Sequence, residues 1–289
     1  MSGDDLRDLL ATGAPVVMPG VWDAISARLA AKAGFSTVFV SGYAVAGTQL
    51  AVPDIGYVTQ TEMADVARRI RLGVPEVLTV VDADTGFGNP LNTIRTVDLW
   101  EQAGATGLFL EDQVFPKRCG HMAGKQVIER ADWLAKLRAA RSHSSSLFLT
   151  ARTDARAPRG LDEAIERGRA ARDLGVDAVF IEAPESLDEL EQIARALPDV
   201  TLVANMVETG KTPLLTGAEL HELGFDLIVS PLTALFAAVK AMQDALAILA
   251  AEGSLRDHLG QLATFDGFTS LVELERHRAL DAAFGGDVA

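Results

Sequence analysis

Two aspartates that lie two positions apart, Asp82 and Asp84, stand where an apolar run of the sequence ends. Side chains at positions i and i+2 of an extended segment project the same way, so both carboxylates should face one space. A third acid, Glu111, ends the next apolar run, whereas its neighbour Asp112 should point to the opposite face. Carboxylate oxygens suit a hard cation that keeps several waters, so these acids predict a site for Mg²⁺, with Mn²⁺ as an alternative. The competing interpretation is that the acids cap the helices that follow.

The single cysteine of the chain, Cys119, lies in a segment from Asp112 to His121 that has neither helical nor strand periodicity. Lys117, Arg118 and His121 flank the thiol, and a positive environment favours the thiolate and supports proton exchange. We therefore predict a catalytic thiol on a polar loop. A buried, inert cysteine is the alternative, but a basic loop that contains glycine is a poor place to bury one.

Arg152 ends another apolar run, and its guanidinium could bind a substrate carboxylate through two parallel hydrogen bonds. It could instead pair within the protein, with Asp154 or Glu182. Either arrangement fixes a guanidinium near the acids. Asn205, at the end of a later run, offers a neutral hydrogen-bond donor.

Short apolar runs alternate with longer segments of helical period, which is typical of βα units around a parallel sheet. The predicted strands are Val16–Pro19, Thr37–Ser41, Val77–Asp82, Gly107–Glu111, Leu147–Arg152, Ala178–Glu182, Thr201–Asn205 and Leu227–Ser230. The predicted helices between them include Trp22–Ala33, Glu62–Leu72, Leu91–Ala103, Leu161–Leu174 and Leu187–Ala196. Several helices end in a glycine before the next strand, and no Gly-x-Gly-x-x-Gly turn follows the first strand, which favours a closed (β/α)8 TIM barrel over an open sheet. The carboxyl ends of barrel strands meet at one rim, so the polar residues that end these runs should form one site.

Three more helical segments are predicted after the eighth strand, at Leu235–Glu252, Leu255–Leu262 and Leu271–Phe284. Eight βα units do not require them. We therefore expect a single barrel domain over residues 1–289 in which residues 235–289 form a C-terminal helical extension. This extension could pack on the barrel or exchange with a second subunit.

The composition excludes several classes of partner. A formal net charge of −14 disfavours nucleic acid and anionic membranes, although local basic residues can still collect a small anionic substrate. The amino-terminal segment is acidic and lacks the basic start and apolar run of a secretory signal, and no uninterrupted apolar stretch has the length of a membrane span. One cysteine cannot form an intrachain disulfide, which fits a reducing compartment. We expect a cytoplasmic protein.

Taken together, these residues resemble the isocitrate lyase and phosphoenolpyruvate mutase superfamily. The matching segments are Ser41-Gly42, Pro53-Asp54, Asp82 to Gly88, Leu110 to Gln113, Lys117 to His121, Ala151 to Ala155, Ala204 to Glu208 and Pro231-Leu232. They occur in family order, and the Lys-Arg-Cys-Gly-His loop is the most specific of them. The resemblance implies a barrel whose C-terminal helix swaps between subunits, within a homotetramer built as a dimer of helix-swapped dimers.

The resemblance also implies roles for individual residues. Asp84 would bind magnesium directly, and Asp82 and Glu111 largely through water. The implied catalytic residues are Cys119, Lys117, His121, Arg152 and Glu182, with Cys119 as the general acid. The implied substrate-binding residues are Ser41, Gly42, Tyr43, Asp54, Gly120 and Asn205.

The activity that the resemblance implies is cleavage of a carbon–carbon bond in a small 2-hydroxy di- or tricarboxylate, which gives a 2-oxo acid such as pyruvate and a saturated acid. Methylisocitrate lyases usually have Ser-Gly-Gly and Asn-Ile-Thr-Glu where this chain has Ser41-Gly42-Tyr43 and Asn205-Met206-Val207-Glu208. These departures resemble the 2-alkylmalate lyases, which also act on oxaloacetate. Carboxyphosphonoenolpyruvate mutase resembles the chain at the same two places, so carbon–phosphorus chemistry is the alternative. A catalytically inactive barrel that acts as a binding protein is disfavoured, because every expected metal and loop position is filled.

Overall fold

The computed structural model describes residues 1–120, 122 and 124–284. These residues form two units, Met1–Leu235 and Phe236–Ala289. The first unit contains all eight strands and every site residue predicted from the sequence, except that His121 lies outside the described residues.

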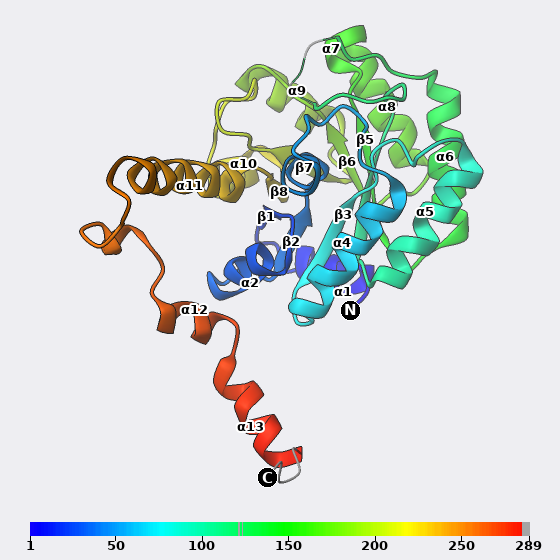
Figure 1. Cartoon of the computed structure of the whole chain (residues 1–289). Helices are drawn as coiled ribbons and strands as arrows, with labels where there is room; N and C mark the ends of the chain where they lie inside the picture. The colour runs from blue at the N-terminus through cyan, green and yellow to red at the C-terminus, as the bar shows by residue number, and fades with distance from the viewer. Residues whose placement is uncertain (121, 123, 285–289) are drawn as a thin grey trace. The chain divides into compact units, whose positions relative to one another are not determined.

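Eight parallel strands close into a barrel in chain order, with β8 paired to β1 (Figure 1). The strands are β1 (Val16–Val21), β2 (Thr37–Val40), β3 (Leu78–Asp82), β4 (Gly107–Glu111), β5 (Phe148–Thr153), β6 (Ala178–Ile181), β7 (Thr201–Asn205) and β8 (Leu227–Ser230). The predicted (β/α)8 barrel is therefore confirmed, with all eight strands in the predicted places.

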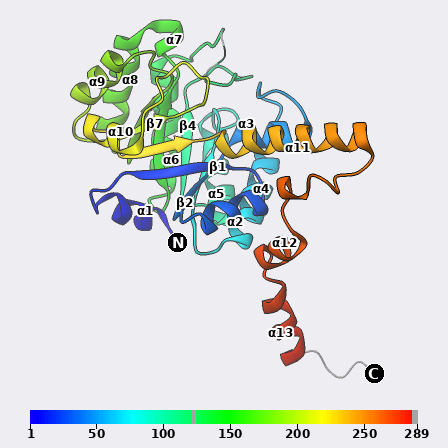
Figure 2. The same ribbon diagram turned by 90° about the vertical axis from the view of Figure 1, so that its left-hand side faces the viewer.

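The barrel helices lie outside the strands (Figures 1 and 2). They are α1 (Gly3–Leu10), α2 (Ala24–Lys32), α3 (Gly42–Val45), α4 (Gln60–Gly73), α5 (Pro90–Ala103), α6 (Arg130–His143), α7 (Arg156–Arg159), α8 (Leu161–Asp173), α9 (Leu187–Ala196) and α10 (Gly217–Leu223), with one π-helical turn, η1 (Ala46–Leu50). The glycines expected to end helices do adopt the left-handed conformation that closes them, as at Gly104 (φ 80°) and Gly224 (φ 100°). Helices α1 and α6 were not predicted from the sequence, whereas the helix end expected at Leu223-Gly224 is that of α10.

Large apolar side chains fill the barrel interior. Phe109 lies between Phe39 and Phe180, with ring centroids 4.9 and 5.7 Å away. At the amino-terminal end of the strands, α1 adds the fully buried Leu6 to the same cluster. The interior is thus a packed core, which leaves the opposite rim for a site.

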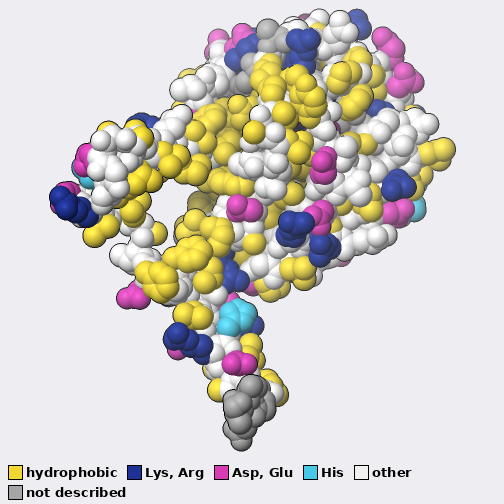
Figure 3. Space-filling view, viewed as in Figure 1, with side chains coloured by type: hydrophobic (Ala, Val, Ile, Leu, Met, Phe, Trp, Pro, Cys, Tyr) yellow, Lys and Arg dark blue, Asp and Glu magenta, His cyan; other side chains and the backbone are white. Residues whose placement is uncertain are grey.

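The second unit consists of the remainder of α11 (Thr233–Glu252), a 3-10 turn η2 (Leu259–Gln261), α12 (Phe265–Leu271) and α13 (Leu274–Phe284). The prediction of a helix over Leu255–Leu262 was wrong, because only one tight turn forms there, and Leu271–Phe284 is broken between α12 and α13. Hydrophobic side chains gather along these helices (Figure 3), and none of the described residues of α12 or α13 is buried.

Helix α11 is long and apolar enough, by length and composition alone, to cross a membrane. A single helix of this kind is weak evidence for a membrane span. Its apolar sequence is interrupted by Lys240 and Asp244, which form an ion pair one helical turn apart.

Candidate active site

The predicted carboxylates do share one space at the carboxyl ends of β3 and β4. Asp84 adopts a left-handed backbone conformation (φ 44°), and its amide donates to Oδ1 of Asp82 at 3.0 Å. A Cβ placed on Gly42 would lie 3.0 Å from Oδ2 of Asp82 and 3.5 Å from Oδ1 of Asp84. Both acids therefore face Gly42, and glycine at this position leaves the space beside them open.

Glu111 adds a buried carboxylate whose two oxygens have no hydrogen-bond partner. Burial raises its pKa well above the usual range, although Arg152 opposes the shift. A cation would relieve the cost of burying this acid. Among the described residues, no three His, Cys, Asp or Glu side chains are close enough to hold an ion by direct contact alone. The partnerless oxygens of Glu111 and the carboxylates of Asp82 and Asp84 are hard donors, which suit a cation such as Mg²⁺ that retains much of its water.

Lys117 joins the loop to the carboxylates. Its Nζ lies 2.6 Å from Oδ1 of Asp54 and 2.8 Å from Oδ1 of Asp84, and its side chain is buried. Burial raises the pKa of Asp84 to about 7, against the opposing effect of Lys117. Burial favours the neutral lysine, but Asp84 and Asp54 outweigh it and hold the pKa of Lys117 well above its usual value. Lys117 is therefore a fixed positive charge beside the predicted metal site.

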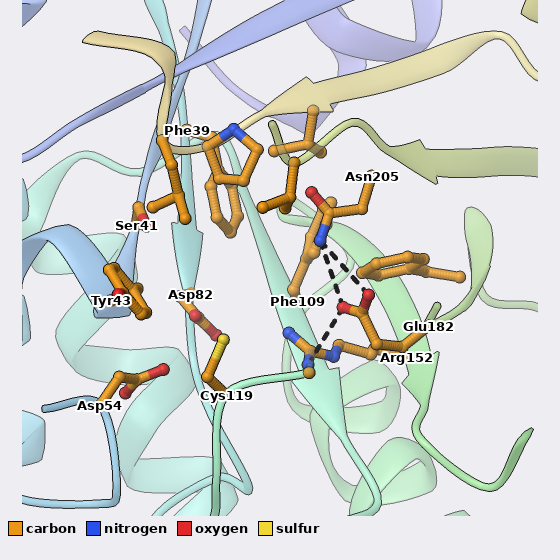
Figure 4. Close-up of a pocket in the computed structure, with 16 residues that line it drawn as sticks. Phe39, Ser41, Tyr43, Asp54, Asp82, Phe109, Cys119, Arg152, Glu182 and Asn205 are labelled. Atoms are coloured by element: carbon orange, nitrogen blue, oxygen red, sulfur yellow. Dashed lines mark hydrogen bonds and ion pairs between the residues drawn. The ribbon is translucent and has the colours of Figure 1, made fainter. Parts of the chain in front are cut away.

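Hydrogen bonds to backbone atoms hold the cysteine loop, the segment between β4 and α6 (residues 112–129), over the rim. The Gln113 side chain accepts from the amide of Arg118 at 3.0 Å and donates to its carbonyl at 2.8 Å. The amide of Cys119 donates to the carbonyl of Asp54 at 3.1 Å. Cys119 is partly exposed and lines the pocket, so the thiol is not buried in the core (Figure 4).

Arg152 forms the opposite side of the pocket with Glu182 and Asn205 (Figure 4). Its guanidinium contacts Asp154 at 2.9 Å and Glu182 at 3.1 Å, and Nε lies 3.4 Å from Glu111. Asn205 donates from Nδ2 to Glu182 at 3.3 Å, and its buried Oδ1 has no hydrogen-bond partner. The interpretation that Arg152 pairs within the protein is therefore confirmed. The guanidinium also lines the pocket, and binding of a substrate carboxylate by Arg152 stays a prediction.

Gly120 lies directly against Glu182. A Cβ on Gly120 would stand 2.5 Å from Cδ and 2.6 Å from Oε2 of Glu182, closer than side chains approach one another. A side chain at position 120 would therefore force either this carboxylate or the loop backbone to shift.

The pocket contains about 480 Å³ of empty space, part of which is open to solvent. Its polar lining consists of Ser41, Tyr43, Asp54, Asp82, Cys119, Arg152, Glu182 and Asn205. Its apolar lining consists of Phe39, Phe109, Phe180, Val207, Val229, Pro231 and Leu232. The oxygen of Ser41 also accepts from the amide of Ala44 at 3.3 Å and so begins α3.

Asp112 points away from this pocket, as the sequence predicted for the neighbour of Glu111. It accepts from the hydroxyl of Thr153 at 2.5 Å and the amide of Asp154 at 2.8 Å, and pairs with Arg167 at 3.0 Å. Sequence reasoning missed this support and also Lys125, whose buried Nζ lies 2.7 Å from Asp154. The sequence predicted only the direction of the Asp112 side chain and not its partners, and Lys125 lies outside the Lys117 to His121 motif, so no local pattern marked these contacts.

A parallel barrel whose carboxyl rim gathers acids, a guanidinium and a thiol-bearing loop defines a (β/α)8-barrel enzyme. The family model for phosphoenolpyruvate phosphomutase matches residues 6–250. The chain belongs to this family of lyases and mutases, the phosphoenolpyruvate mutase and isocitrate lyase superfamily.

Relatives with several different activities match nearly the whole chain. The petal death protein of Dianthus caryophyllus is 46% identical over 93% of this chain and 85% of its own length. The carboxyvinyl-carboxyphosphonate phosphorylmutase of Arabidopsis thaliana is 48% identical over 93% and 80%. The 2,3-dimethylmalate lyase of Eubacterium barkeri is 41% identical over 96% of both chains. Oxaloacetate acetylhydrolase bound to 3,3-difluorooxalacetate superposes with a TM-score of 0.94 at 34% identity, covering 100% of this chain and 99% of that one.

Proposed function

We propose that this enzyme is a magnesium-dependent carbon–carbon lyase that cleaves a 2-alkylmalate to a 2-oxo acid and a saturated acid. The observation that carries the proposal is that Cys119 lines the same pocket as Asp82, Arg152 and Glu182. This pocket would place a proton donor next to groups that can bind and polarise an anionic substrate. The relatives named as lyases of 2-methylisocitrate and 2,3-dimethylmalate support the same reaction type.

We assign the acids at the rim to the binding of Mg²⁺. Asp84 would hold Mg²⁺, and Asp82 and Glu111 would hold its water ligands. When bound, Mg²⁺ supplies a Lewis acid that polarises the 2-oxygen and a neighbouring carboxylate of the substrate. A crystal structure of phosphonopyruvate hydrolase, which is 28% identical to this chain, holds oxalate and Mg²⁺.

Arg152 binds and orients the substrate as the bond between C2 and C3 breaks. The carboxylate of Glu182, which lines the pocket, takes the proton of the 2-hydroxyl. The 2-oxygen becomes the carbonyl of the 2-oxo acid, while the electron pair of the broken bond moves to C3. Arg152 stays charged, because Asp154 and Glu111 outweigh burial and hold its pKa well above the usual value. A fixed guanidinium can stabilise negative charge as it develops, with little reorganisation.

Cys119 then gives its proton to C3 and completes the saturated acid. Ser41, Gly42 and Tyr43 would contact the substrate carboxylate, and Asp54 and Gly120 would complete the binding site. Lys117 and His121 would assist proton transfer at the thiol. Proton delivery by a positioned side chain typically contributes about 10²–10⁴-fold to the rate.

The apolar side of the pocket selects among substrates. Val207, Pro231 and Leu232 line the pocket with hydrocarbon and offer no side-chain donor to a third substrate carboxylate. Arg152 is the one cationic side chain among the described residues that line the pocket. An alkyl-substituted dicarboxylate is therefore a better fit than a tricarboxylate.

A substrate panel tests the proposal. The enzyme with Mg²⁺ is incubated with 2,3-dimethylmalate, 2-methylisocitrate, oxaloacetate and isocitrate, and 2-oxo acid, oxalate and acetate are measured. We expect the highest kcat/KM for 2,3-dimethylmalate, and loss of turnover in EDTA and in the Cys119→Ala variant. Absence of carbon–carbon cleavage with all four compounds would refute the proposal.

A second candidate is carboxyphosphonoenolpyruvate mutase activity. The identity of 48% to the Arabidopsis phosphorylmutase favours it. Turnover of carboxyphosphonoenolpyruvate, seen as a new phosphorus resonance, together with no cleavage of any 2-hydroxy acid, would establish this alternative.

We further propose that the enzyme is a cytoplasmic homotetramer, a dimer of dimers that exchange their C-terminal helices. The apolar side chains of residues 236–284, such as Met242, Leu246 and Phe265, support an interface there. Light scattering coupled to gel filtration should give four times the mass of 30.7 kDa. A monomer at micromolar concentration would contradict the tetramer.

A further inference from the structure

Lys125 is a buried cation that the proposed chemistry does not use. It lies six residues after the thiol, in the cysteine loop between β4 and α6, residues 112–129. Its side chain is completely buried together with that of Asp154. The two form an ion pair at 2.7 Å. Lys125 also donates to the carbonyl of Gly120, the residue that lies against Glu182. One ammonium group thus connects the loop backbone beside the thiol to the barrel.

Asp154 is a fixed anchor for this cation. Arg152 contacts both of its carboxylate oxygens, and Asp112 accepts from its amide at 2.8 Å. Asp112 is in turn held by the buried Arg167. Although burial favours the neutral acid, Arg152 and Lys125 keep the pKa of Asp154 far below its usual value. Asp154 is therefore anionic, and Asp112 and Arg167 fix its backbone in place.

We propose that Lys125 is a positioning residue that docks the cysteine loop onto Asp154 and thereby places the thiol of Cys119 in the pocket. The inference rests on the proposed role of Cys119. The same carboxylate positions Arg152, so Asp154 aligns the group that binds substrate with the loop that carries the proton donor. A buried ion pair is costly to break on one side, which makes this contact suited to holding the docked loop.

The single cysteine provides a direct measurement of docking. Its reaction rate with 5,5′-dithiobis(2-nitrobenzoate) reports how often the loop exposes the thiol, without any substrate. We expect the Lys125→Met variant to react at least about tenfold faster than the wild type, because one partner of a buried pair has been lost. Removing a nearby positive charge would by itself lower the thiolate fraction and slow the reaction, so the electrostatic explanation predicts the opposite sign.

The matched control is Gln126→Met, which places the same side chain at the next, exposed position of the loop. It should react at the wild-type rate. In turnover assays, Lys125→Met should lower kcat more than tenfold with KM changed less than threefold, and Lys125→Arg should restore part of kcat. If Lys125→Met does not fold, as judged by circular dichroism, Lys125→Gln is measured with the same expectation.

A thiol reaction in a folded Lys125 variant that is no faster than in Gln126→Met would overturn the inference, whatever the substrate proves to be. Faster thiol reaction without turnover of any tested substrate would leave docking supported and would count against the proposed function instead.

Discussion

Replacing Gly120 by alanine tests how closely the cysteine loop must approach the barrel. The added Cβ would lie 2.5 Å from Cδ of Glu182, whereas ordinary van der Waals contact begins at 3.4 Å. The two atoms must therefore move apart by about 0.9 Å. Glu182 cannot easily supply it, because Arg152 and Asn205 hold its carboxylate at 3.1 and 3.3 Å. The loop should therefore move away from the pocket by nearly the whole distance.

A misplacement of about 1 Å can cost about 10²-fold in rate, which corresponds to ~2.7 kcal/mol in the transition state. We expect Gly120→Ala to lower kcat/KM for the best substrate by about this factor. The effect should fall mainly on kcat, since Arg152 still binds the substrate. Steady-state release of 2-oxo acid measures both constants.

Gly47→Ala is the matched control, because no atom lies within 4 Å of a Cβ at that exposed position and its backbone is unstrained. It should retain wild-type activity. A folded Gly120→Ala enzyme within twofold of the wild type would refute the reasoning, since the loop would then not need its close approach to Glu182.

Three further variants test other parts of the account. Arg152→Lys keeps the charge but loses the forked donor, so kcat should fall by about 10²–10³-fold in the turnover assay; an active lysine variant would contradict the bidentate role. Leu6→Ala should lower the free energy of unfolding by about 2–5 kcal/mol in urea, because Leu6 is fully buried in the barrel core; an unchanged midpoint would show that α1 is dispensable. Asp177 accepts from Arg7 at 2.8 Å and from the amide of Leu149 at 2.7 Å, and these bonds outweigh burial and lower its pKa. A carboxylate whose pKa is lowered in the folded state contributes its full stabilisation at pH values above the ordinary pKa of ~3.9. This contribution is lost as the pH falls through the pKa of the folded state. Asp177→Asn should therefore lower the free energy of unfolding by about 1.5–3 kcal/mol at neutral pH and by progressively less below pH ~4. An equal loss at neutral pH and below pH ~4 would contradict the lowered pKa of Asp177.

The barrel could be predicted from the sequence because its buried parallel strands are short apolar runs that end in polar residues. Seven of the eight predicted runs, such as Gly107–Glu111, end in a polar residue at the carboxyl rim. Helix α6 was missed because it contains many charged residues. Only the end of α10, at Leu223-Gly224, was predicted, because this helix is short. The segment Leu255–Leu262 has apolar spacing but forms only a 3-10 turn, which shows that spacing without packing does not secure a helix.

The site residues followed from strand ends and from the cysteine motif, but their supports did not. Lys125 and Asp112 act through contacts with Asp154, which is 29 and 42 residues away in the chain. Only the closed barrel brings these segments together. The sequence likewise did not predict that Val207 and Leu232 line the pocket, although both lie in segments that match the family.

The most direct test of the central claim is the reaction of 2,3-dimethylmalate with the enzyme and Mg²⁺ in D₂O, followed by nuclear magnetic resonance. The account predicts pyruvate and propionate in equal amounts, with one deuterium at C2 of propionate, because the exchanged thiol of Cys119 delivers it. The Cys119→Ala variant should fail to form propionate. Unchanged propionate formation in the folded Cys119→Ala enzyme, or no cleavage by the wild type, would contradict the claim that Cys119 completes a carbon–carbon bond cleavage in this pocket.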